Sequence, residues 1–158
     1  MFNINWKTGS SNNINYNTII LQIKEHSKNN GTVYIGTDSF FIKDNCIFST
    51  AICLYGADNQ QGGRYFYTKT KLNKKQFPEL SIRMIKEAEN TIVLANNIIE
   101  NVPDAKLELH LDISPQESNE GTSHLANMLV GYVKGSGYEC KVKPYAFAAA
   151  SIADKHSK

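Results

Sequence analysis

Two aspartates occupy equivalent places in two segments of the sequence that resemble β-strands. Asp38 lies near the end of YIGTDS, and Asp112 lies near the end of LELHLDIS. An Asp at the end of a strand is also common as a turn or cap residue. If the two strands are adjacent and parallel, however, both carboxylates lie at the carboxyl edge of the sheet, where open α/β sheets bind ligands. The pair therefore predicts a site built on two carboxylates.

A third carboxylate can come from the longest helical pattern, Pro78–Glu100. At about 100° per residue, Glu87 lies at the edge of the apolar arc of this pattern and Glu89 lies on its polar side. The arc contains Leu80, Met84, Thr91, Leu94 and Ile98. We therefore expect Glu87 to face the sheet and Glu89 to face solvent. The competing interpretation is an ion pair between Glu87 and Arg83, one helical turn earlier.

Asp154 is a fourth candidate, in a small-residue segment near the C-terminus. Helical spacing puts it on one face with Phe147, Ala150 and Ser151. The alanines allow close approach to a sheet, which would bring Asp154 toward the same edge as the other acids. A solvated carboxylate is the competing interpretation. His156 follows closely and is a candidate for shuttling protons or releasing product, although histidines near a terminus are usually solvated.

The net charge of +2 conceals an uneven distribution along the chain. Residues 1–63 are neutral, residues 64–86 carry +6, residues 87–120 carry −7 and residues 121–158 carry +3. A basic surface beside clustered carboxylates is typical of enzymes that hold metal ions against a nucleic-acid backbone. Solvated helix and strand faces also produce such runs.

Contacts with a nucleic-acid backbone are expected from the lysines of the basic segment, namely Lys69, Lys71, Lys74 and Lys75. They follow three aromatic residues, Tyr65, Phe66 and Tyr67. Lysines with stacking aromatic side chains suit single strands or RNA. Because these aromatic residues alternate along a predicted strand, at least half of them are expected in the core.

The elements that must position these residues follow from hydrophobic periodicity and turn signals. Residues 1–16 are polar and Asn-rich, and we expect a loosely ordered N-terminal arm there. Helical patterns begin at Asn17, at Pro78 and at Tyr145. A further helix, reaching about Lys134, is predicted to begin at the capping-box spacing of residues 114–117. The predicted strands are 32–37, 47–55, 64–70, 106–112 and 139–143.

Short polar turns join the first three strands, so antiparallel hairpins are the natural connection. Helices precede the last two strands, so these should join the sheet in parallel through crossovers. The predicted fold is a single α/β domain over residues 17–158. Its mixed five-stranded sheet has three antiparallel and two parallel strands, with helices on both faces. This order matches the ribonuclease-H-like architecture.

Three segments carry a family resemblance, namely IGTDS (35–39), LHLDIS (109–114) and KPYAFAAASIADKH (143–156). Over residues 17–156 the chain resembles the YkuK-type family of ribonuclease-H-like proteins, which are predicted nucleases. The resemblance implies a metal-dependent nuclease site, with Asp38, Glu87, Asp112 and Asp154 at the matching positions. It also implies products with 3′-hydroxyl and 5′-phosphate ends. The basic loop that some ribonucleases H use to grip hybrids has no evident counterpart, so hybrid specificity is not implied.

Carboxylates crowded at one point repel one another, and a divalent cation relieves the repulsion. Hard oxygen ligands select Mg²⁺ or Mn²⁺, and two ions about 3.5–4 Å apart would flank a scissile phosphate. We expect Asp38 and Asp112 to be the central ligands. The three cysteines contain no CxxC pair and the four histidines have no ligand spacing, so zinc is disfavoured. His110 is expected to be a satisfied core histidine.

Composition narrows the remaining function classes. With 41% hydrophobic and 20% charged residues the chain is globular, and no apolar run approaches a membrane span. We expect a cytoplasmic protein with reduced cysteines, nucleic acid as its partner and no disulfide partner. One alternative is a non-catalytic nucleic-acid-binding or scaffold module on the same fold. A phosphotransferase related to sugar kinases is disfavoured, because it would need two such domains or a glycine-rich phosphate loop.

Overall fold

The computed structural model describes residues 5–114 and 125–157. The strands are β1 (Trp6–Thr8), β2 (Asn13–Ile14), β3 (Thr32–Ile42), β4 (Asn45–Tyr55), β5 (Arg64–Asn73), β6 (Lys106–Leu111) and β7 (Glu139–Lys141). The helices are α1 (Tyr16–Lys28), α2 (Leu80–Asn101), α3 (Ala126–Gly135) and α4 (Asp154–Ser157). A 3₁₀ turn, η1 (Lys74–Gln76), follows β5, and a π-helical segment, η3 (Ala148–Ala153), runs directly into α4. We call η3 and α4 together the C-terminal helix.

The seven strands form one mixed sheet in the order β2-β1-β5-β4-β3-β6-β7. Strands β3, β4 and β5 pair antiparallel, whereas β6 pairs parallel with both β3 and β7. The predicted topology of three antiparallel strands followed by two parallel ones is therefore confirmed. The predicted number of five strands is wrong, because β1 and β2 extend the sheet beyond β5.

The N-terminal segment is an ordered part of the sheet from Trp6 onward, so the expectation of a loosely ordered arm is wrong there. Trp6 pairs with Thr68 of β5 and is only 1% exposed. Its ring stacks on Tyr16, with ring centroids 5.8 Å apart. A single large aromatic side chain buries enough apolar surface to hold a short strand in an otherwise polar segment.

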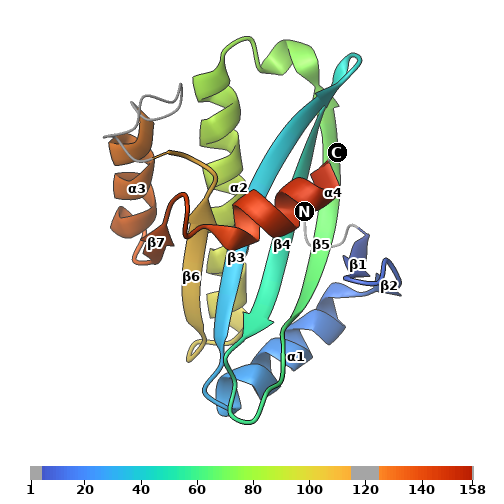
Figure 1. Ribbon diagram of the computed structural model, residues 1–158, viewed down its shortest axis with the longest axis vertical. Coiled ribbons are helices and arrows are strands. Elements are labelled where there is room, and N and C mark those ends of the chain that lie inside the picture. The colour runs from blue at the N-terminus through green and yellow to red at the C-terminus, as the bar shows by residue number, and fades with distance from the viewer. Residues whose placement is uncertain (1–4, 115–124, 158) are drawn as a thin grey trace.

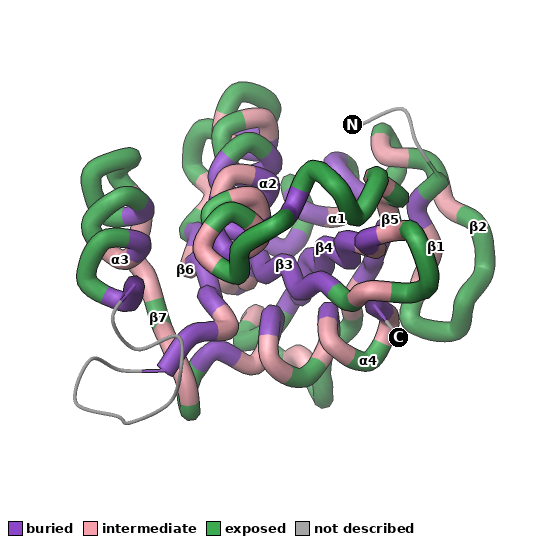
Figure 2. Tube along the Cα trace, turned by 90° about the horizontal axis from the view of Figure 1, so that it is seen from above, coloured by how far each residue is buried: buried purple, intermediate pink, exposed green. Residues whose placement is uncertain are grey.

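Helices cover both faces of the sheet, as predicted. Figure 2 shows α1 and α2 on one side of β3 and β4, with α4 on the other side. In Figure 1 the C-terminal helix crosses the front of the sheet, and α3 stands beside β6 and β7. In the described part of the chain, no helix is long and apolar enough to span a membrane.

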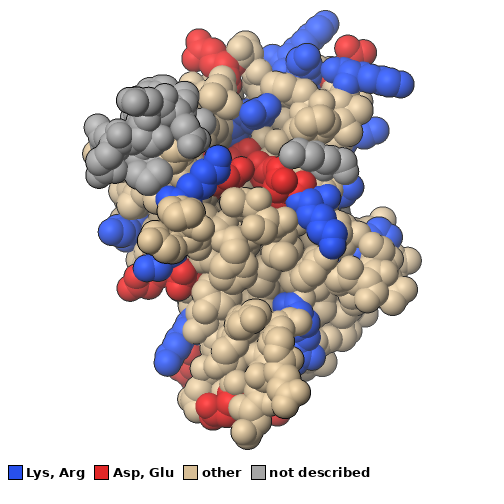
Figure 3. Space-filling view, in the orientation of Figure 1, with Lys and Arg blue, Asp and Glu red and all other residues tan. Residues whose placement is uncertain are grey.

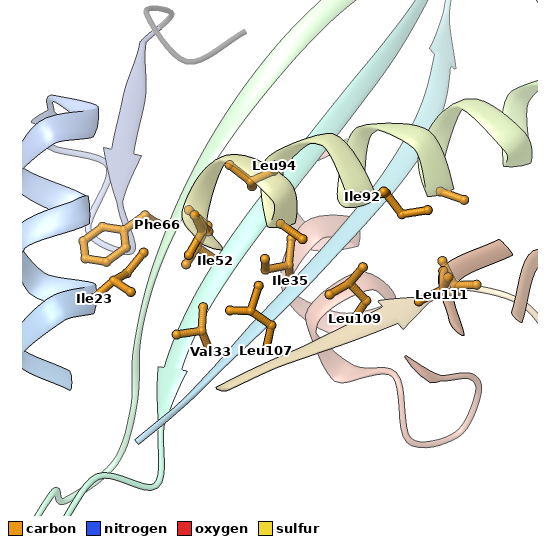
Figure 4. Close-up of a cluster of buried hydrophobic side chains, with 14 of the residues drawn as sticks. Ile23, Val33, Ile35, Ile52, Phe66, Ile92, Leu94, Leu107, Leu109 and Leu111 are labelled. Atoms are coloured by element: carbon orange, nitrogen blue, oxygen red, sulfur yellow. The ribbon is translucent and has the colours of Figure 1, made fainter. Parts of the chain in front are cut away.

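The main core lies between the sheet and the layer of α1, α2 and α3 (Figure 4). Alternate residues of the strands enter it, including Ile35 of β3 and Leu109 of β6, and helix residues such as Ile23 and Leu94 meet them. A smaller buried cluster on the opposite face consists of small side chains where the C-terminal helix meets β4, namely Ala51 and Cys53 of the strand and Ala148 and Ala153 of the helix. Small residues at this interface let the helix lie close to the sheet.

Strand β3 is longer than predicted, and this extension shapes one end of the molecule. The sequence pattern predicts a strand over residues 32–37, whereas β3 continues through Ile42 in a hairpin with β4. Its partner on the other side, β6, stops at Leu111, opposite Thr37. Asp38 is therefore the first residue of β3 past the end of its pairing with β6. Asp112 follows β6 directly, so the two aspartates lie at the same level of the sheet.

The remaining boundaries shift by a few residues. Helix α2 covers Leu80–Asn101 where the pattern predicts residues 78–100. Strand β7 ends at Lys141, two residues earlier than predicted. The capping box predicted over 114–117 falls, except for Ser114, outside the described residues.

Candidate active site

Asp38 faces the C-terminal helix from the middle of β3 and is 7% exposed. Gly36, two residues earlier on the same face, permits this approach. A Cβ at Gly36 would collide with the backbone nitrogen of Ala149 and lie 2.7 Å from the carbonyl carbon of Ala148. At the end of the C-terminal helix, Ser157 donates a hydrogen bond to Oδ2 of Asp38 at 3.2 Å. The helix is therefore held against β3 on both sides of the carboxylate.

Asp112 and Asp154 interact directly with Asp38. Burial, hydrogen bonding with Asp154 and the negative charge of Asp112 together raise the pKa of Asp38 to about 8, with burial the largest cause. These three acids come from β3, from the residue after β6 and from the start of α4. The structure thus brings together three of the four predicted carboxylates at one point.

A lysine forms an ion pair with this group. The ammonium nitrogen of Lys143 lies 3.4 Å from Oδ1 of Asp112. This oxygen is buried and forms no hydrogen bond, so the contact is an ion pair without hydrogen-bond geometry. Lys143 opens the segment KPYAFAAASIADKH, but its sequence position alone did not identify it as a partner of Asp112.

Glu87 approaches from the other face of the sheet. It is 7% exposed and accepts a short hydrogen bond from the hydroxyl of Ser39, the residue after Asp38. Burial raises the pKa of Glu87 well above its usual value, and the charge of Asp38 acts in the same direction. Consecutive residues of a strand face opposite sides of the sheet. Asp38 therefore faces the C-terminal helix, while Ser39 contacts Glu87 on the other face.

Helical phase correctly distinguishes Glu87 from Glu89. The side chain of Glu89 is 47% exposed and pairs with Lys86 at 3.3 Å. The competing interpretation for Glu87, an ion pair with Arg83, is not found among the described residues. The Arg83 guanidinium instead lies over the ring of Phe41, 4.6 Å from its centroid, and lowers the pKa of Glu87 only in part.

Figure 3 shows the carboxylates gathered in the middle of one face, where the C-terminal helix crosses the sheet, with Lys and Arg side chains around them. All four candidate ligands offer carboxylate oxygens, the donor type that Mg²⁺ and Mn²⁺ prefer. Within residues 5–114 and 125–157, no group of three or more His, Cys, Asp or Glu side chains already has the arrangement of a metal site. The donor chemistry fits a divalent cation, and in the structure Lys143 pairs with one of these carboxylates, Asp112.

His156 is engaged by aromatic residues of β5. Its ring stacks on Tyr67 with centroids 3.6 Å apart, and its Nε2 is 2.9 Å from the hydroxyl of Tyr65. Burial, with the nearby charges of Lys155 and Lys69, lowers the pKa of His156. This histidine therefore anchors the C-terminal helix to β5. With Phe66 and Tyr67 also buried, the aromatic residues of β5 present little ring surface for stacking on bases.

The predicted basic run separates into two pairs of lysines. Lys69 and Lys71 line a cavity of about 360 Å³ together with Ser157. Lys74 and Lys75 line a different cavity with Asp44, beyond the end of β5. The first pair therefore lies beside Ser157, the hydrogen-bond donor to Asp38.

His110 is a satisfied core histidine, as predicted. Its Nδ1 accepts a hydrogen bond from the backbone N–H of Ala148 at 3.0 Å. Its Nε2 therefore carries the proton and donates to Glu108 at 3.0 Å. Burial lowers the pKa of His110, which favours this neutral form.

A family model described as Ribonuclease H-like matches residues 15–158. Among curated proteins and among solved structures, nothing matches the chain.

Proposed function

Because the chain belongs to the ribonuclease H-like family, whose model covers residues 15–158, we propose that it is a metal-dependent nuclease that hydrolyses phosphodiester bonds of RNA or DNA. The observation that carries the proposal is the meeting of Asp38, Asp112 and Asp154, supplied by three elements that are distant in sequence. The proposal includes a cytoplasmic location, consistent with free cysteines at positions 46, 53 and 140.

In this proposal Asp38 and Asp112 are the central metal ligands, and Glu87 and Asp154 complete the ligand set. Two Mg²⁺ or Mn²⁺ ions, when bound, would activate a water molecule and stabilise negative charge at the scissile phosphate. Carboxylates that cannot all ionise together without a cation are suited to this role, because binding the cation compensates for their repulsion.

The chain's own residues prepare the site. The pKa of Asp38, raised to about 8, favours its protonated form at neutral pH, and this proton would leave when a cation binds. Lys143 must also move away from Oδ1 of Asp112. This oxygen forms no hydrogen bond, so it would then be available to a cation. Ser39 and Ser157 donate hydrogen bonds to Glu87 and Asp38, which restrict the orientation of both carboxylates.

The test is a nuclease assay with Mn²⁺ or Mg²⁺ on single-stranded, duplex, hybrid and branched substrates. We expect Asp38→Asn and Asp112→Asn to reduce cleavage at least about a thousandfold, equivalent to about 4 kcal/mol of transition-state stabilisation. Glu89→Gln is the matched control, because Glu89 lies on the exposed side of α2. Cleavage that persists in both Asp variants would place the reaction elsewhere.

The second candidate is a non-catalytic nucleic-acid-binding or scaffold module. It is favoured by the position of Lys143, whose ammonium group partly neutralises the acidic cluster without a metal. In that case isothermal titration would detect no divalent-cation binding that depends on Asp38, while nucleic acid would still bind. Lys143→Ala separates the two functions, because it should strengthen metal binding by a nuclease site and leave a metal-independent module unchanged.

A further inference from the structure

Beyond the C-terminal helix, the face of the sheet that carries Asp38 continues as an exposed surface. We call this surface the open strip, and it consists of Phe40, Ile42, Ile47, Lys69 and Lys71. Phe40 is opposite Ile47, which is opposite Lys71 on the next strand. Directly opposed residues share a face, so these side chains lie side by side. Phe40 is 39% exposed and Ile42 is 41% exposed.

The open strip is continuous with the candidate active site. Phe40 follows Asp38 by two residues on the same face, about 6.8 Å along the strand. In the adjacent row, Asp38 is opposite Ser49 and Ser49 is opposite Lys69. The cavity of about 360 Å³ is lined by Ile42, Ile47, Lys69, Thr70, Lys71 and Ser157. A ligand in this cavity would therefore lie beside Ser157, the residue that donates to Asp38.

The chemistry of the open strip combines apolar and basic side chains. An exposed aromatic ring and two isoleucines form an apolar floor, and two lysines extend along one side of it. No carboxylate is among the described residues that line the cavity. In Figure 3 uncharged surface lies above the red carboxylates, toward the end of the sheet where β3 meets β4, with blue groups around it.

An unpaired nucleic-acid strand matches both features. Its bases expose flat faces that stack on aromatic and apolar side chains, and its phosphates pair with lysines. A duplex keeps its base faces inside the helix, so it would use only the lysines. We propose that the open strip binds a single-stranded segment, with bases on Phe40 and phosphates on Lys69 and Lys71. This inference rests on the proposed function, and it makes the substrate a single strand of RNA or DNA.

The stacking residue in this proposal belongs to β3. The sequence pattern favours Tyr65, Phe66 and Tyr67 of β5 as the residues that stack on bases. In the structure, however, Phe66 and Tyr67 are buried and Tyr65 contacts His156. Phe40 lies outside that pattern, because the strand predicted before it ends at Thr37.

Binding can be measured independently of cleavage. Labelled oligonucleotides of one sequence, as single-stranded RNA, single-stranded DNA and the corresponding duplexes, are titrated by fluorescence anisotropy in EDTA. We expect Phe40→Ala to weaken single-strand binding about tenfold and to leave duplex binding unchanged. Phe40→Leu should retain part of the affinity, since it keeps apolar surface. Tyr132→Ala is the matched control, because Tyr132 is a similarly exposed aromatic residue on α3.

The lysines are tested through salt dependence. Lys69→Gln combined with Lys71→Gln should reduce the slope of log affinity against log salt by about 1.4 for single strands. Lys28→Gln, on α1, should leave the slope unchanged. Equal losses for single strands and duplexes in Phe40→Ala, or no loss in either, would overturn the proposal. Single-strand binding without metal-dependent cleavage would instead support the open strip and reject the nuclease function.

Discussion

The hydroxyl of Ser157 donates a hydrogen bond to Asp38 across 119 residues of sequence, at 3.2 Å. Ser157 is 1% exposed, yet it also lines the cavity that carries Lys69 and Lys71. One side chain thus contacts the central carboxylate and borders the open strip. The position of the C-terminal helix therefore influences both the ligands of the proposed metal site and the surface that leads to it.

The metal-free protein should lose stability as pH rises. Asp38 has a usual pKa of 3.8 and a pKa of about 8 in the folded protein, so the folded state binds more protons between these values. The contribution of Asp38 to the free energy of unfolding is then fully present below about pH 4. It decreases toward pH 8, by up to about 1.4 kcal/mol per pH unit. The raised pKa of Glu87 acts in the same direction. Urea unfolding at several pH values in EDTA measures the slope.

Asp38→Asn removes one of the two carboxyl groups with raised pKa values, so the stability of this variant should depend less on pH than that of the wild type. Glu89→Gln should retain the wild-type slope. Because Mn²⁺ replaces a proton at the proposed site, its stabilising effect should increase with pH. A metal-free protein whose stability rises steadily between pH 5 and pH 8 would contradict the raised pKa of Asp38.

Removal of the Ser39 hydroxyl should destabilise the protein through Glu87. In Ser39→Ala, this buried carboxylate loses its hydrogen-bond donor, and we expect a loss of about 1–3 kcal/mol in the free energy of unfolding. The loss should be greatest at high pH, where Glu87 must be charged. Ser10→Ala, at an exposed position, is the control. Equal stability of Ser39→Ala and wild type at pH 9 would exclude this role of the hydrogen bond.

A methyl group at position 36 should displace the C-terminal helix. In Gly36→Ala the new Cβ meets backbone atoms of Ala148 and Ala149, which cannot move independently of the helix. We expect a loss of about 1–3 kcal/mol in stability and weaker Mn²⁺ binding, both measurable by thermal unfolding with and without metal. Gly131→Ala is the matched control, since nothing lies within 4 Å of its new Cβ. A Gly36→Ala protein with wild-type melting temperature and metal affinity would refute the close contact.

His156 should act as an anchor of the C-terminal helix and not as a proton carrier. His156→Phe retains an aromatic ring for Tyr67 and loses the hydrogen bond to Tyr65, whereas His156→Ala loses both. We expect melting temperature and cleavage rate to fall together, with His156→Phe between the wild type and His156→Ala. The pH profile of cleavage should keep its shape in both variants. A stable His156→Phe protein with strongly reduced cleavage and an altered pH profile would favour proton transfer.

Local patterns were sufficient to predict most of the acidic residues of the candidate site. Asp38 and Asp112 follow from matched strand positions, and Glu87 follows from helical phase, because these periodicities decide which side a residue faces. The parallel placement of β6 beside β3 follows from the crossover helix between β5 and β6. That these residues bind a metal ion is a proposal, and the metal titrations described above test it.

Features that depend on partners distant in the sequence could not be predicted in this way. The strand at Trp6 has a polar local sequence and is held by contacts with β5. The extension of β3 past Asp38 depends on pairing with β4, which overrides the turn signal of an aspartate. Ser157 and Lys143 contact Asp38 and Asp112 only after the sheet has formed, and neither has a distinctive sequence pattern.

The long-range origin of the carboxylate cluster also determines when it can form during folding. Strand β3 pairs with β4 across a short hairpin, whereas its contacts with β6 and the C-terminal helix close much longer loops, the latter over 119 residues. Because long loops cost more entropy to close, we expect the hairpin to form early and the acidic groups to meet last. Their mutual repulsion would then slow the final docking step rather than the start of folding. A divalent cation, or acidic pH, should accelerate that step and leave the earlier steps unchanged.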